Sequence, residues 1–224
     1  MDIIKGHNYA VITGDIIGSK RFSKEDRQSV YALMKAGSQA VRQYFEQDFP
    51  LDIAIARGDE WQALVVRPCQ ALRIALYYRA TLKGGMPDKD LDTRFAIGIG
   101  TVNFIPGDNT AEGDGAAFNL SGKTLDGLDR FTIGVAVEHE AFDHFTSALQ
   151  AAALLVDSQA QQWTAPQAQA VSGMLLGWKQ SDIASAWQPA PISQQAVSRH
   201  LQSAGWPFVE QGLSIYEDLI VRWA

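Results

Sequence analysis

Two aspartates in the first third of the chain stand where acidic side chains can bind a metal ion. Asp15 comes just after the apolar run 9–13, whose composition is typical of a buried strand. Asp59 follows Gly58 in a short break between two further apolar runs, as in the turn of a hairpin. If these strands are neighbours, the two carboxylates meet at one sheet edge and can bind Mg²⁺ together with phosphate oxygens. The alternative is that Asp15 caps the next segment and Asp59 only forms a turn.

A loop suited to a phosphate group follows Asp15. Ile17, Gly18, Ser19 and Lys20 together offer main-chain N–H groups, a hydroxyl and an ammonium group. Phosphate oxygens accept hydrogen bonds from all three kinds of donor. The sequence therefore predicts a site for Mg²⁺ and for a nucleotide or another phosphorylated small molecule.

The surrounding sequence predicts an α/β fold that brings these residues together. Apolar residues recur at helical spacing over 25–45 and alternate at strand spacing over 51–66, which indicates a helix and then a hairpin. The later elements are expected as a helix over 68–82, a strand over 94–104, a helix around 118–128 and a strand over 131–137. This β-α-β-β-α-β-α-β order favours an α+β sandwich on a mixed sheet, because the hairpin must be antiparallel. Gly98 and Gly100 indicate that some other group approaches the backbone of this strand closely.

The last third of the chain predicts a small all-α domain with a helix-turn-helix. Helices are expected over 166–176, 180–186 and 193–204, the last capped by Ser193 and ended by Gly205. Polar residues on the outer side of the third helix are of the types that read base edges and phosphates in a major groove. These candidate DNA-binding residues are Gln194, Gln195, Ser198 and Arg199.

Charge gives little support to extensive DNA binding. The whole chain has a formal net charge of −6. The segment 159–224 carries Lys179, Arg199 and Arg222 against Asp182, Glu210, Glu217 and Asp218, so three minus four gives −1. Phosphate contacts dominate DNA affinity, so a single copy should bind weakly and a homodimer more tightly. The alternative is a three-helix bundle that only packs on the first domain or mediates dimer contacts.

Composition points to an ordinary intracellular chain of two parts. Among 224 residues there is a single cysteine, Cys69, which fits the reducing cytoplasm. The N-terminal residues do not resemble a signal peptide, and no apolar run is long enough to cross a membrane. We expect a first domain over 1–157 and a helical domain over 158–224, because an Ala- and Gln-rich stretch with almost no charge separates them.

Four blocks of sequence resemble a known family. These blocks are VITGDIIGS, RGDEWQ, RFAIGIGTV and DGAAFNLSGKTL, and they look like the SatD family over nearly the whole chain. More distantly, residues 8–137 resemble the palm domain of class III nucleotidyl cyclases and GGDEF proteins. The second resemblance implies a ferredoxin-like, nucleotidyl cyclase-like palm that works as a homodimer.

The cyclase resemblance assigns roles to particular residues. It implies that Asp15 and Asp59 are the metal-binding aspartates and that Ile16 adds its main-chain carbonyl. It places Arg94 at the start of a strand pattern next to the nucleotide. It also matches Asn119 and Lys123 to the asparagine and arginine that neutralise the triphosphate across the dimer interface, should the chain be an enzyme.

Two departures from the cyclase pattern shape the functional hypothesis. Ile55 stands where cyclases carry a base-reading residue, and Lys123 replaces an arginine whose planar fork grips phosphate. We therefore expect no cyclase activity, and favour a regulator that binds a metal and a phosphorylated ligand and acts on DNA. The alternatives are a metal-dependent enzyme acting on a nucleoside triphosphate, and a degenerate palm that serves as an interaction scaffold.

Overall fold

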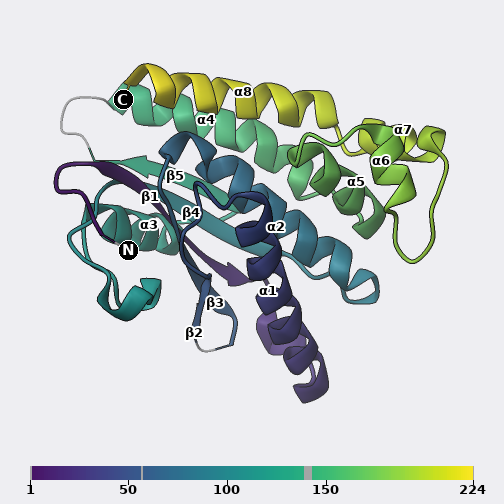
Figure 1. The fold of residues 1–224 in the computed structure, drawn as a ribbon, viewed down its shortest axis with the longest axis horizontal. Coiled ribbons are helices and arrows are strands. Elements are labelled where there is room, and N and C mark those ends of the chain that lie inside the picture. The colour runs from purple at the N-terminus through teal and green to yellow at the C-terminus, as the bar shows by residue number, and fades with distance from the viewer. Residues whose placement is uncertain (1, 57, 139–142, 224) are drawn as a thin grey trace.

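The computed structural model describes residues 2–56, 58–138 and 143–223, and a five-stranded mixed sheet forms its centre (Figure 1). The strand order is β2-β3-β1-β4-β5. The strands are β1 (Asn8–Ile16), β2 (Ala54–Ala56), β3 (Glu60–Val65), β4 (Thr93–Thr101) and β5 (Ile133–Val137). The first four pair antiparallel, as in the ferredoxin-like β-α-β-β-α-β unit. β5 joins β4 in parallel, so the predicted mixed α+β architecture is confirmed.

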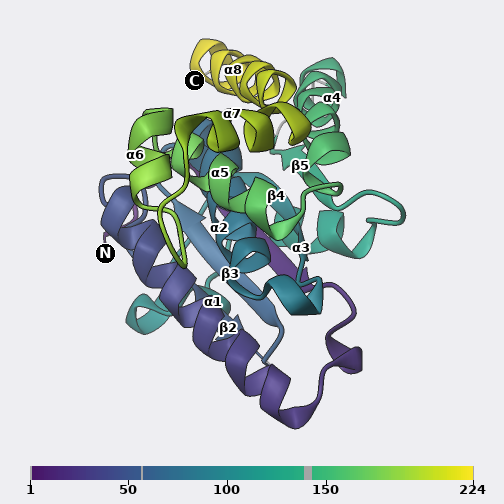
Figure 2. The same ribbon diagram turned by 90° about the vertical axis from the view of Figure 1, so that its right-hand side faces the viewer.

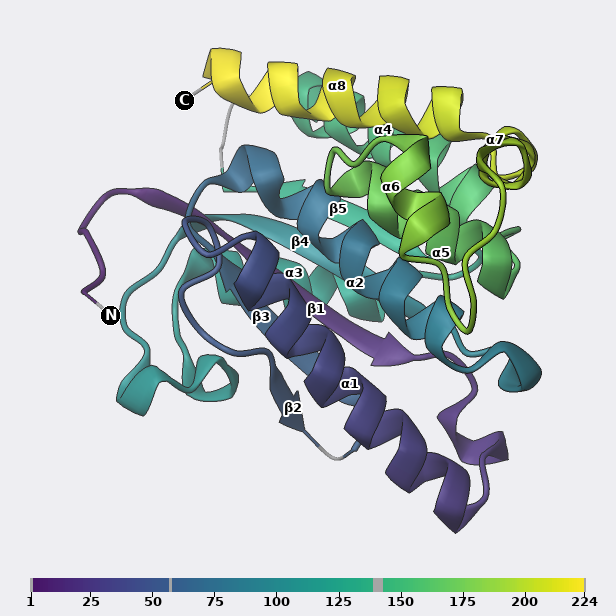
Figure 3. The same ribbon diagram turned by 45° about the vertical axis from the view of Figure 1, so that its right-hand side comes forward.

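Helices cover both faces of the sheet. α1 (Lys24–Tyr44) and α2 (Ala71–Gly85) lie on one face (Figure 3), and α3 (Ala116–Asp126) lies on the other. Alternate residues of β1 face opposite sides, so Ile12 belongs to the core under α1 and α2, whereas Val11 packs toward α3.

The close approach expected at the fourth strand is made by α3. A Cβ at Gly98 would lie 2.2 Å from the carbonyl oxygen of Ala117 and 2.5 Å from the main-chain nitrogen of Ser121. Real Cβ atoms do not come this near to backbone, so a side chain at position 98 would push α3 off the sheet. The glycine thus sets the distance between β4 and this helix.

Five helices form the C-terminal region. They are α4 (Asp143–Ala160), α5 (Ala165–Leu175), α6 (Gln180–Ser185), α7 (Gln194–Ser203) and α8 (Trp206–Trp223). α8 and α4 lie side by side along the outer rim of the molecule (Figures 1 and 2). The three helices expected here correspond to α5, α6 and α7, whereas α8, which runs for 18 residues, was not predicted. Its buried residues recur at helical spacing against α4 and the core, and that tertiary contact sustains the length.

The C-terminal helices share a core with the sheet. α5 packs on α2, and one continuous apolar cluster extends from β1 through α2 and α5 to α7. Residue 157, the predicted end of the first domain, lies inside α4. Within the described residues, no helix has the length and apolarity needed to span a bilayer.

A cluster of four buried charges also joins the two parts of the molecule. We call this the buried cluster; its members are Arg79, Lys83, Asp92 and Asp157. The guanidinium of Arg79 donates to both oxygens of Asp92 at 2.7 and 2.8 Å and to Asp157 of α4 at 3.2 Å. Lys83 donates to Asp92 at 2.9 Å. The cluster therefore ties α2, the start of β4 and α4 to one another.

Candidate functional site

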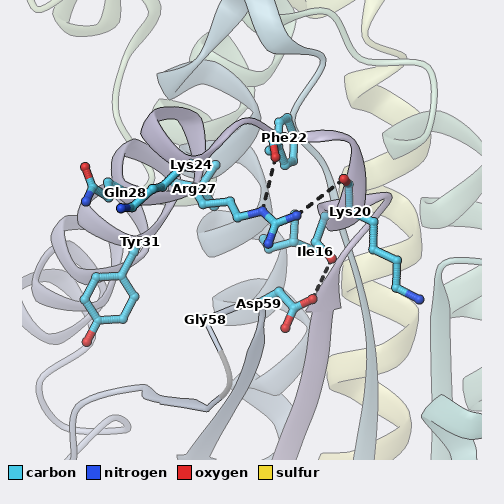
Figure 4. Close-up of a pocket in the computed structure, with 11 residues that line it drawn as sticks. Ile16, Lys20, Phe22, Lys24, Arg27, Gln28, Tyr31, Gly58 and Asp59 are labelled. Atoms are coloured by element: carbon cyan, nitrogen blue, oxygen red, sulfur yellow. Dashed lines mark hydrogen bonds between the residues drawn. The ribbon is translucent and has the colours of Figure 1, made fainter.

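A cavity of about 590 Å³ opens where β1 leads into α1 (Figure 4). It lies on the sheet face that carries α1, between the first turns of that helix, the loop after β1 and the turn between β2 and β3. It is lined by Ile16, Ser19, Lys20, Phe22, Lys24, Arg27, Gln28, Val30, Tyr31, Gly58 and Asp59. Its volume is in the range of small-molecule sites, about 300–1,000 Å³.

Main-chain hydrogen bonds hold the loop and the turn at the mouth of the cavity. The N–H of Ile16 donates to the carbonyl of Asp59 at 3.0 Å, which fastens the hairpin turn to the end of β1. The N–H of Ile17 donates to the carbonyl of Asp92 at 3.0 Å. Gly18 has φ 65°, a left-handed conformation that glycine adopts without strain, and the chain turns there toward α1.

Charges of both signs face the cavity. We call them the cavity cluster; its members are Lys20, Lys24, Arg27 and Asp59. The guanidinium of Arg27 donates to the carbonyls of Phe22 at 3.1 Å and Lys20 at 3.4 Å. This uses part of its donor set and leaves N–H groups for a ligand. The Ser19 hydroxyl donates to the Asp59 carboxylate at 2.5 Å.

The oxygen atoms of Asp59 and Ser19 fit the preferences of Mg²⁺. This ion usually takes one or two carboxylates, several waters and the phosphate oxygens of a ligand, in place of an all-protein cage. The described residues contain no group of three or more His, Cys, Asp or Glu side chains placed to hold a metal by themselves. A metal in the cavity would accordingly need ligand oxygens to complete its shell.

Asp15 and Arg94 lie on the other face of the sheet. Residue 15 shares its side of β1 with Val11, which packs toward α3. Nε of Arg94 donates to both carboxylate oxygens of Asp15 at 2.9 and 3.1 Å, and Nη2 to one of them at 2.8 Å. The hydrogen bond with Asp15 raises the pKa of Arg94 above its usual value. The backbones of residues 15 and 59 thus lie at the same end of the strands, but the Asp15 carboxylate is paired with Arg94, whereas the Asp59 carboxylate accepts from Ser19 at the cavity.

The two predicted transition-state residues are exposed on α3, away from the cavity. Nδ2 of Asn119 donates to the carbonyl of Gly115 at 3.1 Å, and Lys123 is exposed one helical turn later. Since α3 covers the opposite sheet face, neither residue lines the cavity of its own chain. Their action on a nucleotide held by a second copy stays a prediction.

The four residues predicted to contact DNA are all exposed on α7. Gln194, Gln195, Ser198 and Arg199 point away from the core, while Val197 and Leu201 of the same helix are buried. α7 packs on α5, α6 and α8, so the helical region supports it from behind. The polar side of α7 is open to a partner.

Sequence reasoning missed the contribution of α1. Lys24, Arg27, Gln28 and Tyr31 all line the cavity, and they stand at the i, i+3, i+4 and i+7 positions of one helix face. This helix face begins directly after the predicted phosphate loop. That proximity in sequence is the signal from which its contribution to the site could have been predicted.

Comparison with known proteins adds a family and one distant structure. The model of the SatD family matches residues 9–207. Among solved structures, the crystal structure of the guanylyl cyclase Cya2 is similar with a TM-score of 0.45 and 14% identity, covering 60% of this chain and 77% of that chain. A comparison with curated proteins returned no match.

Proposed function

The chain belongs to the SatD family, and we propose that it is a cytoplasmic, ligand-responsive regulator. The cavity beside α1 binds a phosphorylated ligand with Mg²⁺, and α7 binds DNA. Two copies act together as a homodimer. The observation that carries this proposal is the cavity cluster, in which three cations and one carboxylate surround a single opening.

The cavity cluster suits a phosphate group. Lys20, Lys24 and Arg27 offer ammonium and guanidinium donors to the cavity, and charge-assisted hydrogen bonds of this kind are the stronger ones. Asp59 would repel a bare phosphate, and a divalent cation between them turns that repulsion into attraction. The ligand and the ion therefore support each other's binding.

In this proposal the protein binds the phosphorylated ligand and does not convert it to a product. The cyclase resemblance implies that both aspartates bind the ion, whereas here Asp15 is paired with Arg94 on the other sheet face. Incubation with Mg²⁺ and ATP or GTP should accordingly yield no cyclic product. Robust cyclic nucleotide formation that Asp59→Asn abolishes would show that the enzyme alternative is right.

Binding of Mg²⁺ with tripolyphosphate, measured by calorimetry, tests the cavity directly. Lys20→Gln and Arg27→Gln should each weaken binding about tenfold or more, because each removes a charged donor worth about 1.5–3 kcal/mol. Arg130→Gln, an exposed site outside the cavity, should leave affinity unchanged. Asp59→Asn should remove the Mg²⁺ dependence, and the exposed Asp129→Asn should keep it. If the unaltered protein does not bind tripolyphosphate, the ligand-binding proposal is wrong.

The exposed polar side of α7 supports the DNA-binding part. Selection from a library of random-sequence duplexes should enrich specific sites, whose half-sites lie about 34 Å or a multiple apart if two copies bind. Arg199→Ala should cost about 1–3 kcal/mol at an enriched site. Gln211→Ala, exposed on α8 and outside the polar side of α7, is the matched control. No enrichment by the unaltered protein would reject DNA binding and leave the cavity proposal standing.

A further inference from the structure

We infer that the ligand of the cavity is a phosphorylated compound with a planar ring, and that the ring stacks on Tyr31. This inference rests on the proposed function, because it assumes that the cavity cluster binds the phosphate. It adds the chemical class of the rest of the ligand and the residues that select it.

Part of the cavity lining is apolar. Ile16, Phe22 and Val30 contribute to it and are themselves buried in the core, with exposures of 3%, 7% and 3%. These three side chains expose little surface of their own, so most of the apolar area that a ligand can still cover in the cavity belongs to Tyr31. A ligand with an apolar part would cover that area and gain the free energy of its burial.

Tyr31 adds an aromatic surface to the cavity lining. Its side chain is 39% exposed, and it lines the cavity from the third turn of α1. The ammonium of Lys35, one turn further along, lies 4.9 Å from the ring centroid and does not line the cavity. That cation–π contact steadies the ring. A steadied, half-open tyrosine is a good platform for stacking a planar ring.

Polar groups stand at both ends of this arrangement. Figure 4 shows Gln28 and Tyr31 on one side, Lys20 on the opposite side, and Arg27 with Asp59 between them. The Gln28 amide is exposed and offers both a donor and an acceptor, as the edge of a heterocyclic ring requires. A ligand that places its ring beside Tyr31 and its phosphates between Arg27 and Lys20 matches this order.

Nucleoside phosphates and aryl phosphates both combine a planar ring with a phosphate group, and calorimetry in the presence of Mg²⁺ distinguishes between them. The probes are ATP, GTP, CTP, 4-nitrophenyl phosphate, ribose 5-phosphate and tripolyphosphate. We expect at least one nucleoside triphosphate to bind tenfold or more tightly than tripolyphosphate. We expect ribose 5-phosphate to bind more weakly than 4-nitrophenyl phosphate, because it has no planar ring. Preference for the aryl phosphate over every nucleotide would identify a smaller ring-bearing ligand.

Substitution of Tyr31 tests the stacking. Tyr31→Ala should weaken nucleotide binding about tenfold, since stacking on an aromatic side chain has an effect of this size, and leave tripolyphosphate binding unchanged. Tyr31→Phe should bind the nucleotide as tightly as the unaltered protein does, because the ring and not the hydroxyl makes the contact. Tyr44→Ala is the matched control: Tyr44 belongs to the same helix, is 42% exposed and lies outside this cavity. Gln28→Ala should change the ranking of ATP, GTP and CTP.

The possible failures are distinguishable. If nucleotides and tripolyphosphate bind equally and Tyr31→Ala changes neither, the ring inference is wrong while the phosphate site stands. If Tyr31→Ala weakens nucleotide and tripolyphosphate alike, the residue supports the fold of the cavity and does not select the ring. If none of the probes binds, the proposed function fails and this inference fails with it.

Discussion

The cavity cluster and the buried cluster are built from the same residue types and behave in opposite ways. Each combines lysine, arginine and aspartate. In the cavity cluster the three cations are exposed and Asp59 is half-buried. In the buried cluster Arg79 and Asp157 are fully buried, and every member has a charged partner. Exposure to solvent, more than residue type, therefore determines whether a cluster of charges can bind a ligand or is already neutralised within the protein.

The two clusters are also connected. The loop at the cavity is held by the carbonyl of Asp92, which accepts from Ile17, and the Asp92 carboxylate belongs to the buried cluster. Thr93, the next residue, donates its hydroxyl to the carbonyl of Asp15 at 2.6 Å. The buried cluster therefore helps to hold the backbone of the loop that carries part of the cavity cluster.

Arg79→Met should have the largest effect on stability. It leaves Asp92 and Asp157 buried without their guanidinium partner, and breaking a buried ion pair in this way costs about 3–5 kcal/mol. Urea unfolding measures this loss. Arg27→Met in the cavity cluster is the matched control and should change the free energy of unfolding by about 0.5 kcal/mol or less. Equal losses for the two variants would show that the comparison between the clusters is wrong.

Acid should remove the stability that the Asp92 carboxylate contributes to the buried cluster. Burial alone would raise the pKa of Asp92, but the attraction and hydrogen bonds of Arg79 and Lys83 lower it below the usual value. A carboxylate with a lowered folded-state pKa contributes stability above its unfolded pKa of about 3.9. That contribution is lost as the pH falls through the folded-state value.

The free energy of unfolding measured in urea at pH 6, 4 and 3 checks this sign. The unaltered protein should lose stability on acidification more steeply than Asp92→Asn, which lacks the titrating group. Parallel pH profiles for the two proteins would mean that Asp92 contributes nothing to the acid sensitivity.

Arg94→Gln breaks an ion pair whose exposure is intermediate between those of the two clusters, and it should destabilise the protein much less than Arg79→Met. The side chains of Arg94 and Asp15 are 36% and 24% exposed, so their pairing should contribute about 1 kcal/mol or less. The variant frees the Asp15 carboxylate. If that carboxylate is a metal ligand, the Mg²⁺ dependence of tripolyphosphate binding should become stronger by a few fold. An unchanged Mg²⁺ dependence would restrict the ion to Asp59.

Local sequence determined the elements near the cavity. Helical spacing predicted α1, and the Gly58-Asp59 break predicted the hairpin, whose strands β2 and β3 pair antiparallel as expected. Gly98 predicted a close approach to the fourth strand, and in the structure α3 makes it. These features rest on periodicity and on backbone conformation, which a short stretch of chain carries by itself.

Tertiary structure decided which side chains meet. Asp15 looked like a partner of Asp59, yet the register of β1 with β4 places it opposite Arg94, and strand alternation turns it to the α3 face. The buried cluster joins residue 79 to residues 92 and 157, a meeting that needs α2 and α4 to pack on the same sheet. The length of α8 depends in the same way on its contact with α4. The pattern along the chain determines whether a segment forms a helix or a strand. The face that a side chain occupies and the partner it pairs with depend on strand register and on packing between elements distant in sequence, and no local pattern contains that information.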